Sequence, residues 1–154
     1  MHPNIERVAA ELAARGATGE IIELGEAVPT AAAAAERVGC AVGAIANSLV
    51  FDADGAPLLV LTSGAHRVDT AKVAAIVGAA KVRRATPEFV KAATGQAIGG
   101  VAPLGHPAPI RTLVDVALEE FDEVWAAGGV PHTVFPTTYD ELVRVTGGDP
   151  AEVA

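Results

Sequence analysis

The 154-residue sequence is poor in cysteine, in aromatic residues and in basic residues. Its single cysteine, Cys40, cannot form an intrachain disulfide, so nothing in the chain points to an oxidising compartment. Aromatic residues make up 4% of the chain whereas hydrophobic residues make up 51%, so we expect a folded core of small aliphatic side chains rather than disorder. The formal net charge of −8 argues against general binding to nucleic acid or to an anionic membrane, since both require a positive protein surface.

Several signals of membrane, metal and nucleotide binding are also missing. The longest uncharged stretch, residues 92–110, is interrupted by four glycines and three prolines, which a lipid-exposed helix would not tolerate. The four histidines lie far apart, and no glycine-rich phosphate loop is present. We therefore expect a cytoplasmic protein without a membrane segment, a metal or a cofactor.

Apolar periodicity and capping residues predict an interspersed set of helices and strands. The turn Asp52-Ala53-Asp54-Gly55 lies between two apolar runs and predicts a β-hairpin, which makes a purely parallel sheet doubtful. The fold class is therefore α+β, and the length suits a single domain over residues 1–154. We expect helices at 4–15, 31–38, 69–77, 86–95 and 138–147, and strands at 21–24, 44–51, 57–62, 110–114, 123–127 and 132–135.

Two segments have either a functional or a purely structural interpretation. The loop 99–107 contains three glycines and two prolines, and such a loop can present backbone N–H groups to a carbonyl or phosphate oxygen. It could equally turn a corner between two elements. Residues 67–91 carry six basic and two acidic side chains, which could contact a few phosphates or could form a solvated surface.

Four stretches in order resemble the YbaK / prolyl-tRNA-synthetase-associated domain family of aminoacyl-tRNA editing deacylases. The most specific is Gly99-Gly100-Val101-Ala102-Pro103-Leu104-Gly105, which matches the family's G-G-x-x-P-x-G loop. The others are residues 46–51, 59–69 and 81–95, and the resemblance covers about residues 20–148. It implies a curved, mixed, mostly antiparallel, barrel-like sheet with flanking helices. It also implies a pocket for the aminoacyl group and terminal adenosine of a mischarged tRNA.

The resemblance implies roles for particular residues. Active relatives usually carry a lysine immediately before the Ser-Leu of residues 48–49, whereas this chain has Asn47, which offers neutral hydrogen bonds only. The catalytic candidates are Asn47, Gly100 and His132. The substrate-binding candidates are Thr62, Ser63, Gly99, Pro103, Gly105, His106 and Gly129, and the candidates for tRNA contact are Arg83 and Arg84. Several polar residues also have a structural alternative. Asn47 could hydrogen-bond the backbone of its strand, Thr62 and Ser63 could hydrogen-bond at the end of a strand, and His106 and His132 could be exposed to solvent.

Two functions follow from these candidates. The first is a trans-acting aminoacyl-tRNA deacylase that hydrolyses the ester of a small misacylated residue, with the aminoacyl-tRNA acceptor end as its partner. The second is a catalytically silent binding module of the same fold that recognises an aminoacyl or nucleotide-like ligand. Since the sequence contains no heptads, we expect a monomer or a small homodimer.

Overall fold

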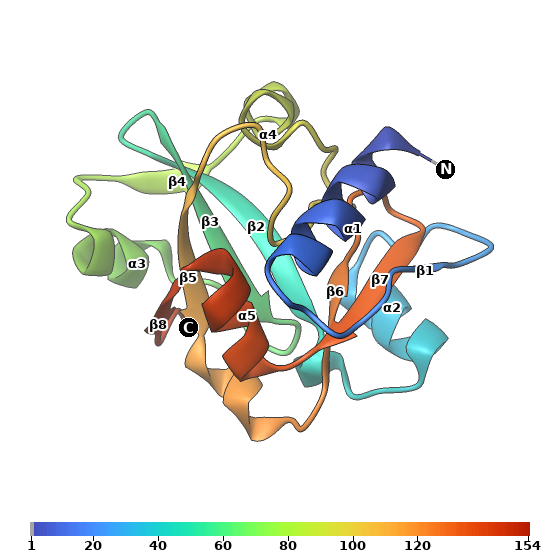
Figure 1. Ribbon diagram of the computed structural model, residues 1–154. Helices are drawn as coiled ribbons and strands as arrows, with labels where there is room; N and C mark the ends of the chain where they lie inside the picture. The colour runs from blue at the N-terminus through green and yellow to red at the C-terminus, as the bar shows by residue number, and fades with distance from the viewer. Residues whose placement is uncertain (1) are drawn as a thin grey trace.

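The computed structural model describes residues 2–154 as an α+β fold with helices around two sheets (Figure 1). The larger sheet has the strand order β4-β2-β3-β5-β8 and the smaller has the order β1-β7-β6. The helices and strands are α1 Pro3–Ala14, β1 Ile22–Glu23, α2 Ala31–Val38, η1 Val42–Ala44, β2 Ala46–Ala53, β3 Ala56–Ser63, α3 Thr70–Val77, β4 Val82–Arg84, α4 Pro87–Thr94, β5 Arg111–Asp115, η2 Val116–Glu120, β6 Val124–Ala127, β7 Thr133–Thr137, α5 Tyr139–Thr146 and β8 Asp149–Ala151.

The β2–β3 hairpin is the centre of the larger sheet, as the Asp/Gly turn predicts. Asp54 and Gly55 have φ of 53° and 92°, the backbone that a two-residue hairpin turn requires. β4 joins β2 antiparallel, whereas β5 and β8 join in parallel. The sheet is therefore mixed, and most strand pairings in the two sheets are antiparallel.

The barrel-like closure that the resemblance implied is not confirmed. Across residues 2–154 the strands form two separate sheets, and a single isolated bridge between Ile45 and Trp125 links them. The two outer strands of the larger sheet, β4 and β8, are only three residues long. Such short edges leave few hydrogen-bonding groups with which to continue the sheet.

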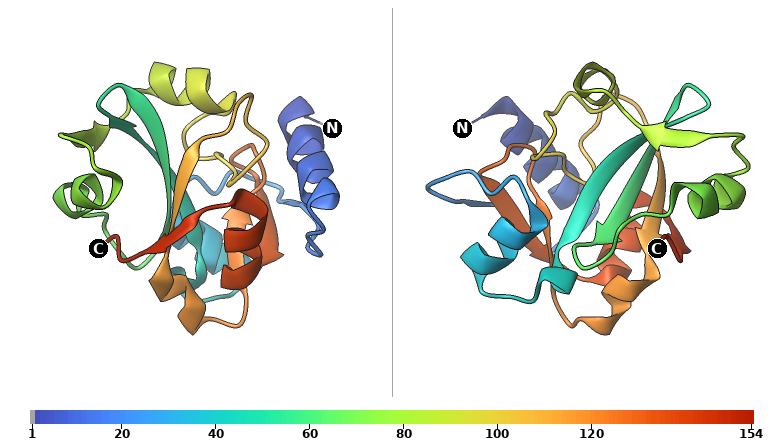
Figure 2. Two further views of the ribbon diagram at one scale, coloured as in Figure 1. Left: turned by 60° about the vertical axis from the view of Figure 1, so that its left-hand side comes forward. Right: turned by 180° about the vertical axis from the view of Figure 1, so that it is seen from behind.

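Alternating side chains of β3 bury both faces of the larger sheet. Leu59 and Leu61 belong to the core that includes Leu142 of α5, whereas Leu58 and Val60 pack with Val73 of α3. Figure 2 shows α3 and α5 on opposite faces of this sheet. A period of two along a strand gives this division, so the sheet is a rigid support for whatever lies at its edges.

Helix caps follow the sequence closely, with one correction. Thr30, Asp69, Thr86 and Thr138 cap α2, α3, α4 and α5 through their side-chain oxygens. For α1 we expected Asn4 to be the cap, and this was wrong, because His2 caps the helix and its ring accepts the hydrogen bond from the Asn4 N–H. Among the described helices, none combines the length and the apolar character that crossing a bilayer would demand.

Candidate functional site

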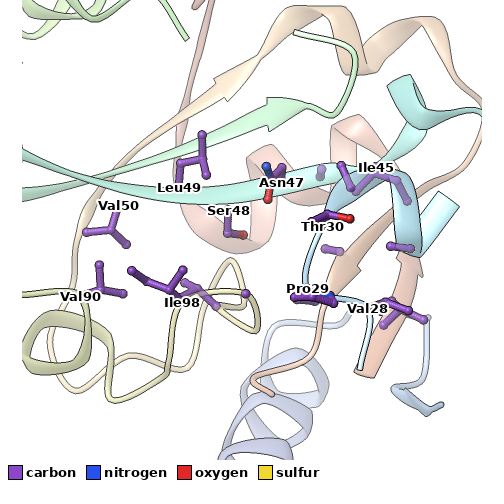
Figure 3. Close-up of a pocket in the computed structure, with 18 of the residues that line it drawn as sticks. Val28, Pro29, Thr30, Ile45, Asn47, Ser48, Leu49, Val50, Val90 and Ile98 are labelled. Carbon is purple, nitrogen blue, oxygen red and sulfur yellow. The ribbon is translucent and has the colours of Figure 1, made fainter. Parts of the chain in front are cut away.

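A pocket of about 310 Å³ lies beside β2, and Figure 3 shows part of its lining. Ligand pockets usually measure about 300–1,000 Å³, so this one suits a small group. Its walls come from β2, from the segment that leads into α2, from the loop before Val101, and from β6 and β7. The lining residues are Val28, Pro29, Thr30, Ala31, Ala34, Ile45, Ala46, Asn47, Ser48, Leu49, Val50, Phe51, Arg84, Ala85, Val90, Ile98, Gly99, Val101, Trp125, Ala126, Ala127, Thr133 and Val134.

The pocket exists because half of β2 has a strand on one side only. β3 pairs with β2 along its whole length, whereas β4 pairs only with residues 51–53. Pro57 has no N–H and lies opposite Asp52, so this pair is a non-hydrogen-bonded one. Counting back in steps of two, Ser48 also lies in a non-hydrogen-bonded pair. Its backbone N–H and C=O therefore point away from β3, toward the free edge that borders the pocket.

Asn47 lines the pocket with its amide unengaged. The residue is partly buried, lies opposite Thr62 on β3, and makes no side-chain hydrogen bond to any other residue of the described chain. An unengaged amide offers two donors and one acceptor oxygen. The structural alternative was that the Asn47 side chain hydrogen-bonds the backbone of neighbouring strands, and residues 2–154 contain no such bond.

Arg84 is the charged side chain among the described residues that line the pocket. It lies on β4 opposite Phe51 and is exposed. Its neighbour Arg83 points to the other face and pairs with the carboxylate of Asp52 at 3.4 Å. The structure therefore separates the two arginines that we expected to contact tRNA.

The glycine loop forms one wall of the pocket through Gly99, whose φ of +93° and close approach to Pro29 favour a residue without a side chain. Gly100 is not among the lining residues. Its N–H donates to the Ala97 carbonyl at 3.0 Å, and it packs against the backbone of Val130 and Pro131. Gln96 holds the loop from inside, because its buried Oε1 accepts from the Ala102 N–H at 2.7 Å.

The continuation of this loop borders a second cavity of about 200 Å³, where Pro103, Gly105 and His106 lie with Glu11 and Arg15. The His106 Nε2 lies 2.9 Å from the Ala102 carbonyl, to which it donates. Burial lowers the pKa of His106, and the nearby charge of Arg15 lowers it further. The loop thus separates two cavities, and these three residues belong to the second.

The remaining candidates lie outside both cavities. Thr62 and Ser63 bind the buried Asp115 carboxylate, at 3.3 Å from the Thr62 hydroxyl and 3.0 Å from the Ser63 N–H. His132 lies 3.6 Å from the Glu23 carboxylate, and the Gly129 carbonyl accepts from the Asn4 side chain. Of the twelve candidates, the structure brings Asn47, Gly99 and Arg84 together.

Sequence reasoning missed Ser48, Ile98 and Trp125, all of which line the pocket. Ile98 precedes the glycine pair and is 56% exposed, which is unusual for a large apolar side chain. Ser48 follows Asn47 directly, and that adjacency was the available signal. Trp125 comes from β6, far along the chain, and a bridge to Ile45 links it to the start of β2.

Comparison with known proteins relates the part of the chain that forms this pocket to one family. A sequence model of the aminoacyl-tRNA editing domain matches residues 25–145, a range that contains every lining residue. The uncharacterized protein YwhH of Bacillus subtilis (strain 168) is 32% identical over 124 residues, which are 80% of this chain and 78% of YwhH.

Two further comparisons concern prolyl-tRNA synthesis by name. A crystal structure named "putative trans-editing enzyme for prolyl tRNA synthetase" matches with a TM-score of 0.92 and 42% identity, over 99% of this chain and 98% of that one. A proline–tRNA ligase of Nitratidesulfovibrio vulgaris (strain DP4) is 34% identical over 91 residues, which are 59% of this chain but 16% of the ligase. The match to the ligase is thus to a small part of that protein.

Proposed function

The chain belongs to the aminoacyl-tRNA editing domain family, and from that premise we propose that it is a trans-acting deacylase that hydrolyses the ester of a mischarged tRNA. The observation that supports this best is the pocket at the free edge of β2. There an unengaged Asn47 amide, main-chain groups of Ser48 and an exposed arginine border one small space. These are the groups that an aminoacyl ester with a neighbouring phosphate requires.

The pocket favours a small aminoacyl group. Alanine side chains line it at 31, 34, 46 and 126, with valines at 50, 90 and 101. Its volume of about 310 Å³ must accept the amino acid and part of the terminal nucleoside. A large aromatic residue would compete for that space, so size alone discriminates against it.

In the proposed reaction, the protein hydrolyses the ester by holding the substrate and the Asn47 amide in place for attack by water. Water adds to the ester carbonyl carbon, the bond from that carbon to the ribose oxygen breaks, and the ribose oxygen takes the proton that the water gives up. The Asn47 amide donates to the oxygen on which negative charge develops, and such donors are most effective when they are held in place beforehand. Asn47 replaces the lysine that the resemblance led us to expect, so this stabilisation comes from a neutral donor.

Arg84 supplies the positive charge at the rim. Its guanidinium can bind a phosphate of the acceptor end with two parallel hydrogen bonds. Arg83 is engaged by Asp52, which leaves Arg84 as the better placed of the two.

The test is a panel of misacylated tRNAs incubated with the protein and followed for loss of the ester. Since the names of two similar proteins refer to proline–tRNA ligase or prolyl-tRNA synthetase, the panel uses tRNA for proline charged with alanine, serine, cysteine or proline. We expect hydrolysis of at least one small misacylated form and sparing of the prolyl form. Tight binding of one form without any turnover would instead support the silent binding module.

A further inference from the structure

Ser48 has a hydroxyl that the protein itself leaves without a partner. The oxygen is fully buried and forms no hydrogen bond within residues 2–154. A buried hydroxyl without a partner is costly, and native proteins rarely retain one without a reason. The only other such side-chain atom in the described chain is Nε2 of Gln96, which is not among the residues that line the pocket.

The position of Ser48 directs this hydroxyl into the pocket. Figure 3 shows Ser48 and Val50 on one side of the β2 ribbon and Leu49 on the other. On the side of Ser48 the view shows Ile98 and the segment that carries Pro29, and all of these residues line the pocket. No group within residues 2–154 bonds the hydroxyl, so a ligand in the pocket can supply the missing hydrogen bond.

We propose that Ser48 is a substrate-binding residue whose hydroxyl hydrogen-bonds the aminoacyl group. This rests on the proposed function and names the contact by which the pocket holds the amino acid. Successive side chains of a strand point to opposite faces, so the Asn47 amide and the Ser48 hydroxyl border the pocket from different sides of β2. Both residues line the pocket, so a ligand held at the free edge of the strand lies beside both. The same residue presents its backbone N–H and C=O to the pocket, and these match the carbonyl and amino groups of an α-aminoacyl ligand.

Ser48→Ala should lower the activity of the protein without lowering its stability. Ser48→Ala removes a hydroxyl that has no partner in the free protein, so its melting temperature should equal or exceed that of the parent. The same change should lower kcat/KM on a misacylated tRNA by about tenfold, which is the loss expected for one hydrogen bond to a ligand.

Thr112→Val provides a matched control. It removes a hydroxyl that is bonded within the protein, to the Ile110 carbonyl at 2.9 Å, and Thr112 does not line this pocket. The control should melt at a lower temperature than the parent and retain its activity. The two variants should therefore change stability and function in opposite patterns.

The experiment measures melting temperature, ester hydrolysis, and affinity for an uncleavable analogue, adenosine carrying alanine on its 3′ position through an amide bond. Failure of the parent to hydrolyse any misacylated tRNA would contradict the proposed function alone, because the analogue still tests Ser48. Equal analogue affinity and equal hydrolysis in the parent and Ser48→Ala would overturn the role of Ser48. A melting temperature of Ser48→Ala as low as that of Thr112→Val would also overturn it, since the hydroxyl would then be bonded in the free protein.

Discussion

Gly100→Ala should destabilise the protein because two backbone segments meet at this residue. A Cβ at Gly100 would lie 2.5 Å from the Val130 carbonyl carbon, 2.6 Å from the Pro131 nitrogen and 2.7 Å from the Val130 Cα. Ordinary contacts of this kind measure 3.4–4 Å, so one segment must move by nearly an ångström. Overpacking of this kind costs about 1–3 kcal/mol.

Neither segment can move without losing hydrogen bonds. The Val130 carbonyl accepts from the Thr133 hydroxyl at 2.7 Å, and the Pro131 carbonyl accepts from the Val28 N–H at 2.8 Å. On the other side, Gln96 holds the Ala102 N–H at 2.7 Å. Relaxation therefore has a cost of its own, which favours the upper part of the range.

The assay is equilibrium unfolding in urea together with thermal unfolding. For a chain of this length, each kcal/mol corresponds to about 2–4 °C in melting temperature. Gly25→Ala is the control, because a Cβ there has nothing within 4 Å, and we expect its stability to match the parent. If Gly100→Ala were as stable as Gly25→Ala, the packing argument for this loop would be refuted.

Two further predictions concern charge. Arg84→Ala should weaken tRNA binding and reduce the slope of log affinity against log salt by about 0.7–1, the share of one phosphate contact. As a control, Arg111→Ala removes an exposed arginine that is bonded to the Val77 carbonyl, and it should leave that slope unchanged. An equal effect of both variants would contradict a specific role for Arg84. Because burial lowers the pKa of His106 below its ordinary value of 6.5, the unfolded chain takes up this proton first, so the free energy of unfolding should fall as the pH drops below about 6.5. His106→Gln should flatten that fall in urea titrations between pH 7.5 and 5, and an unchanged pH dependence would show that His106 is not responsible.

The sequence predicted the elements that depend on neighbouring residues. Thr30, Asp69, Thr86 and Thr138 mark helix starts through bonds that span three residues, and the Asp54-Gly55 turn determines the hairpin. β4 and β8 were missed because three-residue strands carry almost no periodic signal. They form only because β2 and β5 offer unpaired edges.

The site was predicted less completely because it depends on contacts between distant segments. Asn47 and Gly99 lie in stretches that resemble the family, and the structure places both of them on the lining of one pocket. Thr62 is paired with Asn47, yet its hydroxyl lies 3.3 Å from the Asp115 carboxylate, a contact across 53 positions that no local pattern indicates. The Ser48 hydroxyl likewise lacks a partner because of how distant segments pack around β2, which no local pattern indicates.

The most direct test of the proposed function is the rate of ester loss from a misacylated tRNA, measured side by side with the parent and with Asn47→Ala. We expect the parent to hydrolyse at least one small misacylated form and Asn47→Ala to be slower by at least about tenfold, since loss of one donor to a developing oxyanion costs about 10²–10³ in other hydrolases. Asn47→Lys should retain part of the activity, because an ammonium group also donates to that oxygen. Equal rates for the parent and Asn47→Ala, in proteins of equal stability, would contradict the account at its central residue.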